Sequence, residues 1–137
     1  MTGLTGVEVG QLLPGFTRIL TRADLVRYAG ASGDFNPIHW SDAAASELGL
    51  PNVIAHGMLT MGTALRVVTD WAGDPARLRS YYVRFTKPVV VPVEGGVEVT
   101  FGGSVVKVAE GIATVSIDAT CGDAKVLGSA TAEVILD

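Results

Sequence analysis

A long apolar segment in the middle of the chain constrains the fold more than any other feature. Residues 58–73 read MLTMGTALRVVTDWAG, and their apolar side chains are spread around most of the circumference of a helix. A helix that is apolar nearly all round is a buried helix. Gly73 and Pro75 end it. The remaining elements are therefore expected to cover this helix.

Strand-like segments follow the helix. Residues 77–93 hold one long or two shorter extended segments, and further strands are predicted over 97–108, 113–121 and 125–136. The Gly-Gly pair inside the second of these regions suggests a bulge or bend. Hairpin-like turns are expected at the short motifs VEGG, AEG and CGDA.

The first third of the chain predicts one short strand, over residues 16–20, and two helices. One helix covers residues 21–33, with Thr21 as N-cap and Asp24 as the partner in a capping box. The other covers residues 41–50. Helices early and antiparallel strands late predict an α+β domain, with a curved antiparallel sheet wrapped on the central helix. A small sheet has two edges, so we expect pairing through an edge into a dimer.

Composition bounds the class of protein. The chain has 137 residues, the usual size of one domain, so residues 1–137 are expected to form a single domain. Ten basic residues against fourteen acidic ones argue against nucleic acid, because a phosphate-binding surface needs clustered Lys and Arg. The single Cys121, expected in or beside a strand, has no disulfide partner within the chain, which suits a reducing compartment.

The chain ends and apolar runs give no sign of export or membrane insertion. The first ten residues, MTGLTGVEVG, lack a cationic start and a continuous apolar run, so no signal peptide is predicted. No apolar run approaches the ~20 residues that a membrane span needs. We therefore expect a cytoplasmic protein.

The segment SGDFNPIHW places an acid and an imidazole five positions apart on irregular backbone. Pro37 disfavours helical geometry at Asn36, and Gly33 precedes the acid. If the loop curls, Asp34 and His39 turn into one pocket, where the imidazole can exchange a proton and the carboxylate can orient it or act as a second acid or base. The same residues also fit an Asx turn followed by a surface histidine.

A second group of residues lies at the start of the apolar helix, in AHGMLTMG. The N–H groups at a helix N-terminus suit a carbonyl oxygen that becomes negative, and Gly57 lets a ligand approach the backbone. The alternative is a tight turn with a structural histidine, His56. Two histidines and one cysteine, none at standard ligand spacing, do not favour a metal site. No nucleophile elbow and no phosphate-binding glycine motif occurs.

The two motifs together resemble those of a known family. YAGASGDFNPIHWSDAAA is similar to the hydratase motif of the MaoC-like (R)-specific enoyl-thioester hydratases and dehydratases, and IAHGMLTMG resembles their second signature. The positions that fill the first pattern are Tyr28, Gly33, Asp34, Asn36, Pro37, Ile38, His39 and Ala45. Over nearly the whole chain, the sequence looks most like the catalytic B-type subunit of the (3R)-hydroxyacyl-ACP dehydratases of mycolic-acid synthesis.

The resemblance implies a hot-dog fold and a reaction. The reaction would be reversible syn elimination of water from a (3R)-hydroxyacyl thioester of CoA or ACP, without a cofactor, by a homodimer or by a heterodimer with a related hot-dog subunit. Carried onto this sequence, the catalytic dyad falls on Asp34 and His39, and the oxyanion role on the Gly57 N–H. Gly33, Asn36, Pro37 and His56 would support the loop.

Two further pairs of residues are less defined. The resemblance places Arg84 and Lys87 near the phosphates of the carrier arm, although an ordinary solvated strand end fits them equally. Many relatives carry a polar group further along the central helix. Thr60 and Thr63 are the nearest hydroxyls, and the sequence favours neither.

Two other functions share this fold. A hot-dog thioesterase would hydrolyse the thioester, but the presence of both Asp34 and His39 favours hydration. A non-catalytic acyl-binding subunit would be expected to lose the acid and the imidazole, and this chain keeps both.

Overall fold

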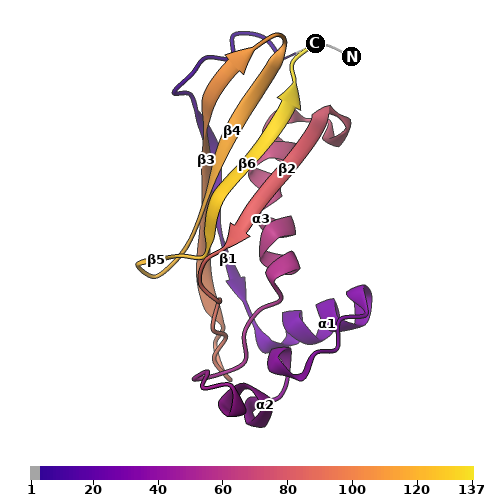
Figure 1. The fold of residues 1–137 in the computed structure, drawn as a ribbon, viewed down its shortest axis with the longest axis vertical. Helices are drawn as coiled ribbons and strands as arrows, with labels where there is room; N and C mark the ends of the chain where they lie inside the picture. The colour runs from indigo at the N-terminus through magenta and orange to yellow at the C-terminus, as the bar shows by residue number, and fades with distance from the viewer. Residues whose placement is uncertain (1–3) are drawn as a thin grey trace.

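The computed structural model describes residues 4–137 (Figure 1). Residues 1–3 lie outside the described residues. They belong to the N-terminal segment, for which no signal peptide is predicted, and to the expected 1–137 domain. The elements in chain order are β1 (Leu12–Leu20), α1 (Arg22–Ser32), the 3₁₀ turn η1 (Pro37–His39), α2 (Asp42–Glu47), α3 (Gly57–Ala72), the 3₁₀ turn η2 (Pro75–Arg77), β2 (Leu78–Phe85), β3 (Val97–Ala109), β4 (Ile112–Cys121), β5 (Ala124–Lys125) and β6 (Leu127–Ile135). Among the described residues, none of the helices has the length and hydropathy to cross a membrane.

The strands form one antiparallel sheet in the order β1-β3-β4-β6-β2, and β5 pairs with β4. The long helix α3 lies against one face of this twisted sheet, while α1 and α2 lie together at one end of the molecule (Figure 1). The predicted α+β architecture, one central helix against a curved antiparallel sheet, is confirmed. The sheet is not closed, and β1 and β2 are its two edges.

The core lies between α3 and the sheet. The buried face of α3 presents Ala64, Val67 and Val68, and the sheet presents large buried side chains such as Phe101 and Val115. These residues alternate along β3 and β4, since one face of each strand turns toward the helix. Burying this apolar surface is the main favourable term for the fold.

Gly103 of the Gly-Gly pair in β3 allows a close approach of the helix, and the expected irregularity falls in the pairing of these glycines with β1. Gly102 and Gly103 keep a regular register with β4. A Cβ at Gly103 would lie 3.2 Å from Cγ1 of Val67 on α3 and 3.0 Å from a backbone oxygen of β4. The irregularity lies opposite instead, in β1 between Leu13 and Phe16. The missing side chain of Gly103 therefore serves packing, and β1 carries the extra residue.

The helix α3 is covered on one side only. Residues at its sheet-facing positions are buried, whereas Met58 on the opposite side is 60% exposed and Arg66 pairs with Asp70 in solvent. The expectation that this helix is buried all round is therefore wrong for the chain by itself. The reason is geometric, because one open sheet contacts one face of a helix.

Local signals for the early elements are confirmed. Thr21 and Asp24 form a complete capping box on α1, and the Ser41 side chain caps α2. The first strand is longer than predicted. The turn at AEG joins β3 to β4 and that at CGDA joins β4 to β5, but VEGG joins no paired strands, because β2 pairs with β6 and not with β3. Cys121 ends β4 half-buried, and burial raises the pKa of its thiol.

Candidate active site

The loop after α1 is built by short-range hydrogen bonds. Gly33 ends the helix with φ 77°, a left-handed conformation that glycine adopts at no steric cost. Asp34 Oδ1 accepts a hydrogen bond from the Asn36 N–H at 3.2 Å, which is an Asx turn. Asn36 Oδ1 accepts one from Ile38 N–H at 3.2 Å and so caps η1, whose first residue is Pro37. The Asx turn thus orients Asp34 rather than excluding it from chemistry.

His39 is buried and has a defined tautomer. Its side chain is 8% exposed, and Nδ1 lies 2.7 Å from the carbonyl oxygen of Ile54. A carbonyl oxygen only accepts, so Nδ1–H is the donor and Nε2 keeps a free lone pair. The alternative of a surface histidine is wrong, because the segment before α3 covers the ring.

Asp34 lies on the Nε2 side of the same ring. Its Oδ2 is 3.8 Å from Nε2 of His39, and its side chain is 51% exposed. This separation exceeds a hydrogen bond. A substrate oxygen or water within hydrogen-bond distance of both groups would complete a triangle with them. The arrangement therefore offers two proton-transfer groups to one reacting atom.

His56 lies behind the dyad and is 1% exposed. Its Nε2–H donates to the backbone carbonyl of Asp34 at 3.1 Å. Its ring stacks on that of His39, with ring centroids 3.8 Å apart and planes at 23°. The Tyr28 ring contacts the His56 ring edge-on, with the ring centroids 4.7 Å apart. Burial is the main cause that lowers the pKa of His56, so the ring favours its neutral form.

Asp34, His39 and His56 bring nitrogen and oxygen atoms within 4.8 Å of one another, a spacing that could suit a metal ion. The orientation of the two rings does not suit one. Imidazole lone pairs lie in the ring plane, and nearly parallel stacked rings direct them along separate planes rather than toward one point.

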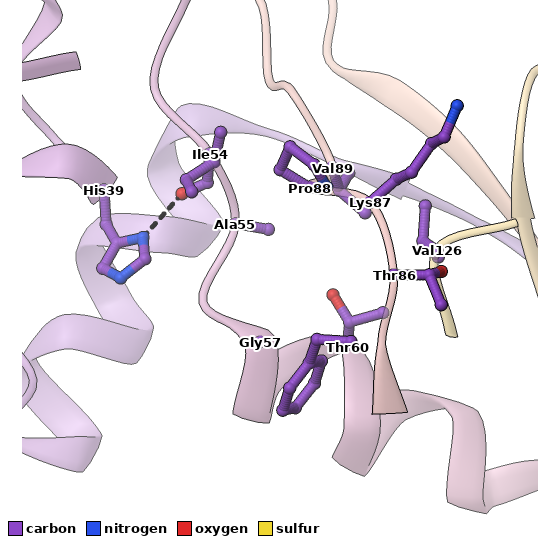
Figure 2. Close-up of a pocket in the computed structure, with 11 residues that line it drawn as sticks. His39, Ile54, Ala55, Gly57, Thr60, Thr86, Lys87, Pro88, Val89 and Val126 are labelled. Carbon is purple, nitrogen blue, oxygen red and sulfur yellow. Dashed lines mark hydrogen bonds between the residues drawn. The ribbon is translucent and has the colours of Figure 1, made fainter. Parts of the chain in front are cut away.

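A cavity of about 310 Å³ lies between the start of α3 and the end of β2 (Figure 2). It is lined by His39, Ile54, Ala55, Gly57, Thr60, Phe85, Thr86, Lys87, Pro88, Val89 and Val126. Most of these side chains are apolar, which suits an acyl group. Asp34 does not line the cavity but lies beyond His39, on the exposed loop.

Gly57 is the first residue of α3 and lines the cavity. Within residues 4–137, no hydrogen bond uses its N–H, as is usual in the first turn of a helix. A Cβ at this position would lie 3.0 Å from the Phe85 ring. The glycine therefore leaves a free donor at the cavity and lets the Phe85 ring lie close to the backbone.

The two threonines of α3 have different environments. The Thr63 hydroxyl donates to the Leu59 carbonyl at 2.7 Å, so it is occupied within the helix. Thr60, one turn beyond Gly57, lines the cavity and its hydroxyl points into it (Figure 2). Its three-residue spacing from Gly57 is the signal that could have distinguished it. Val89 and Val126 carried no such signal.

The two predicted cations, Lys87 and Arg84, also differ in their position relative to the cavity. Lys87 lines the mouth of the cavity, with its amine directed away from the cavity (Figure 2). Arg84 is exposed on β2 and does not line it. Only Lys87 is placed to meet a group that emerges from the cavity.

Comparison with known proteins agrees with this geometry. The model of the MaoC like domain matches residues 11–120. The 3-hydroxyacyl-thioester dehydratase X of Mycobacterium tuberculosis is 43% identical over 61% of this chain, which spans 29% of that protein. The 3-oxo-4,17-pregnadiene-20-carboxyl-CoA hydratase beta subunit of the same organism is 31% identical over 80% of this chain and 81% of its own.

Solved structures share the whole fold. A MaoC-like dehydratase superposes with a TM-score of 0.94 at 39% identity, covering 99% of this chain and 42% of its own. An (R)-hydratase from A. caviae involved in PHA biosynthesis superposes with a TM-score of 0.84 at 27% identity, covering 97% of this chain and 99% of its own. A chain of the ChsH1-ChsH2 complex from Mycobacterium tuberculosis superposes with a TM-score of 0.83 at 27% identity, covering 95% of this chain and 98% of its own. The chain has the hot-dog fold of these proteins and belongs to the MaoC-like domain family.

Proposed function

We propose that this chain catalyses the reversible syn hydration of trans-2-enoyl thioesters to (3R)-hydroxyacyl thioesters. One observation carries the proposal: a buried imidazole with a free Nε2 lies 3.8 Å from the Asp34 carboxylate, at a cavity that Gly57 also lines. A base, an acid and an oxyanion donor are the three parts that this reaction needs.

The chemistry balances with these groups alone. In dehydration, one member of the dyad accepts the proton from C2 while the other gives a proton to the leaving hydroxyl at C3, so that water departs and the C2–C3 double bond forms. The thioester oxygen gains negative charge as the proton leaves, and the Gly57 N–H donates to it. The reaction involves no net oxidation or reduction, so the proposal includes no cofactor.

The names of the relatives support the reaction class. One is called a 3-hydroxyacyl-thioester dehydratase, another a CoA hydratase subunit and a third an (R)-hydratase. We propose acyl-CoA or acyl-ACP thioesters as substrates, with the acyl group in the cavity of about 310 Å³. We further propose a cytoplasmic location, which the single Cys121 suits.

We also propose that residues 1–137 form one hot-dog domain that works against a second one. The exposed Met58 on α3 and Tyr82 on the edge strand β2 leave apolar surface uncovered. One structural neighbour is a two-chain complex, and another chain is more than twice as long as the part that matches. The second domain would come from a copy of this chain or from a related subunit.

The decisive experiment is hydration of crotonyl-CoA by the purified protein, followed by loss of the enoyl-thioester absorbance. Asp34→Asn is the matched control, because the amide keeps the size of the side chain and its Asx turn but not the charge. We expect turnover that gives the (3R)-hydroxy product and falls at least about a hundredfold in the variant. Wild-type turnover in a folded Asp34→Asn protein would refute the dyad.

Two other outcomes select the alternatives. Release of free thiol from acyl-CoA would identify a thioesterase. Binding of enoyl-CoA without turnover, repeated with longer acyl chains, with acyl-ACP and with a co-expressed related subunit, would identify a non-catalytic acyl-binding subunit. The mass of the complex in solution separates a homodimer from a heterodimer.

A further inference from the structure

We infer that His56 is a positioning residue that holds both members of the dyad in one geometry, one by a hydrogen bond and the other by ring stacking. The inference rests on the proposed function, because it concerns the same pair. His56 is not among the residues that line the cavity, and it is 1% exposed. It therefore acts through Asp34 and His39.

The hydrogen bond fixes the backbone of the acid. His56 precedes α3 as its N-cap residue, and its Nε2–H donates to the Asp34 carbonyl oxygen at 3.1 Å. The other hydrogen bonds of Asp34 among the described residues are local, with Ser32 and Asn36. Within residues 4–137, the bond from His56 is the hydrogen bond that ties the Asp34 backbone to the N-cap of the long helix, which also carries the Gly57 N–H.

Ring stacking fixes the imidazole. The bond from His39 Nδ1–H to Ile54 sets the direction of the ring within its plane, but it leaves rotation about the donor–acceptor line free. The His56 ring, stacked at 3.8 Å with 23° between planes, restricts that rotation. Tyr28 contacts His56 edge-on and so supports it from α1. Nε2 is thereby held toward the Asp34 carboxylate.

The pattern of donors keeps His56 neutral. Its Nδ1 is buried and has no hydrogen-bond partner within residues 4–137. A second proton there would create a buried N–H without an acceptor, which is costly. The titratable groups that face the ring are Tyr28, Asp34 and His39, and a charge on His39 repels one on His56. The His56 ring therefore favours its neutral form beside His39.

Two variants separate the two contacts. His56→Phe keeps an aromatic ring for stacking and removes the donor to Asp34. His56→Gln places an amide nitrogen near the Nε2 position and removes the ring. Tyr28→Phe is the matched control, since no hydrogen bond of the Tyr28 hydroxyl is found among the described residues and the ring contact persists.

For the proposed reaction, we expect kcat to fall about 10- to 100-fold in His56→Phe and in His56→Gln, with KM changed less than about threefold. Tyr28→Phe should match the wild type. A residue that merely fills space would lower the melting temperature in both variants and leave kcat of the folded protein unchanged. Wild-type kcat in either folded variant would overturn the inference.

Nitrogen-15 NMR of the imidazoles provides a second, activity-independent test. At neutral pH we expect the Nδ1–H tautomer at His39 and a neutral His56 with its proton on Nε2, and we expect His56 to gain a second proton only below the usual imidazole pKa of 6.5. In His56→Gln the His39 signals should broaden or shift, because the ring is no longer held. A His56 ring that gains its second proton at or above pH 6.5 would refute the inference. If no thioester is turned over, the proposed function fails and the NMR result alone decides the role of His56.

Discussion

The Nδ1 atom of His39 lies 2.7 Å from the carbonyl oxygen of Ile54, and this hydrogen bond determines which nitrogen is available for chemistry. The bond joins η1 to the segment that precedes α3. A second bond, from the Ile54 N–H to the Ile38 carbonyl at 3.1 Å, runs in the opposite direction beside it. The imidazole and the backbone beside it are therefore each anchored to Ile54, and Nε2 is left free for the proposed chemistry.

The first prediction separates the anchor of His39 from its base. In His39→Asn, the amide nitrogen can occupy the Nδ1 position and keep the bond to Ile54, but no atom replaces Nε2. We expect a folded protein whose hydratase turnover falls about 10²- to 10⁴-fold. Turnover and the melting temperature are the two measurements. Substantial activity in this variant would show that Nε2 is not used.

The second prediction concerns the Gly57 N–H. Gly57→Pro removes this single donor at the first position of a helix, which proline tolerates, and the preceding His56 already has φ −59° and ψ 131°. We expect kcat to fall about 10²- to 10³-fold.

Gly57→Ala is the matched control, because it keeps the N–H. In both variants the new Cβ meets the ring of Phe85, which is 55% exposed. Equal losses in the two variants would assign the effect to crowding and remove the oxyanion role.

The third prediction concerns the carrier arm. Lys87 lines the cavity mouth and Arg84 does not, although both are exposed. Lys87→Ala should raise KM for CoA thioesters about three- to tenfold, with kcat little changed and with a weaker dependence on salt than the wild type. Arg84→Ala should behave as the wild type. A reversed order in steady-state kinetics at two salt concentrations would place the phosphates on β2 instead.

The fourth prediction concerns stability and pH. Burial lowers the pKa of His56 from its usual 6.5, so below this pH the unfolded chain binds a proton that the folded protein does not. The His56 contribution to the free energy of unfolding is therefore complete above pH 6.5 and is lost as the pH falls. Urea unfolding of wild type and His56→Gln, from neutral to acidic pH, measures the difference. An unchanged slope would show that His56 does not contribute.

In the same unfolding experiment, Asp24 is expected to affect stability in a separate, lower range of pH. The Thr21 N–H lowers the pKa of this carboxyl below 3.8, so its contribution is present above that value and is lost as the pH falls further. Asp24→Asn should remove that loss without changing the step near neutral pH. The two groups are thus distinguished by the pH at which stability declines.

Features encoded within a few residues were predictable. The capping box of Thr21 and Asp24, the Ser41 cap and the irregular loop around Pro37 follow from side chains that bond to backbone atoms close in sequence. Asp34 and His39 lie only five positions apart, so one turn of irregular backbone brings them to the same side. Alternating apolar residues likewise predicted most of the strands.

Features that depend on packing between distant segments were not predictable. The role of Gly103 required knowledge that Val67 packs over β3, and the exposed side of α3 required knowledge of where the sheet ends. Whether His39 is exposed or buried also depended on the segment around Ile54, which lies 15 residues away in the sequence.

The sequence by itself determined the elements, their order and the two motifs, because backbone preferences and short-range hydrogen bonds act within a few residues. Only the tertiary structure decided the tautomer of His39, the stack with His56 and the cavity walls that include Val89 and Val126. Those features come from side chains brought together across the chain, and their geometry depends on strand register and helix packing that no local pattern encodes.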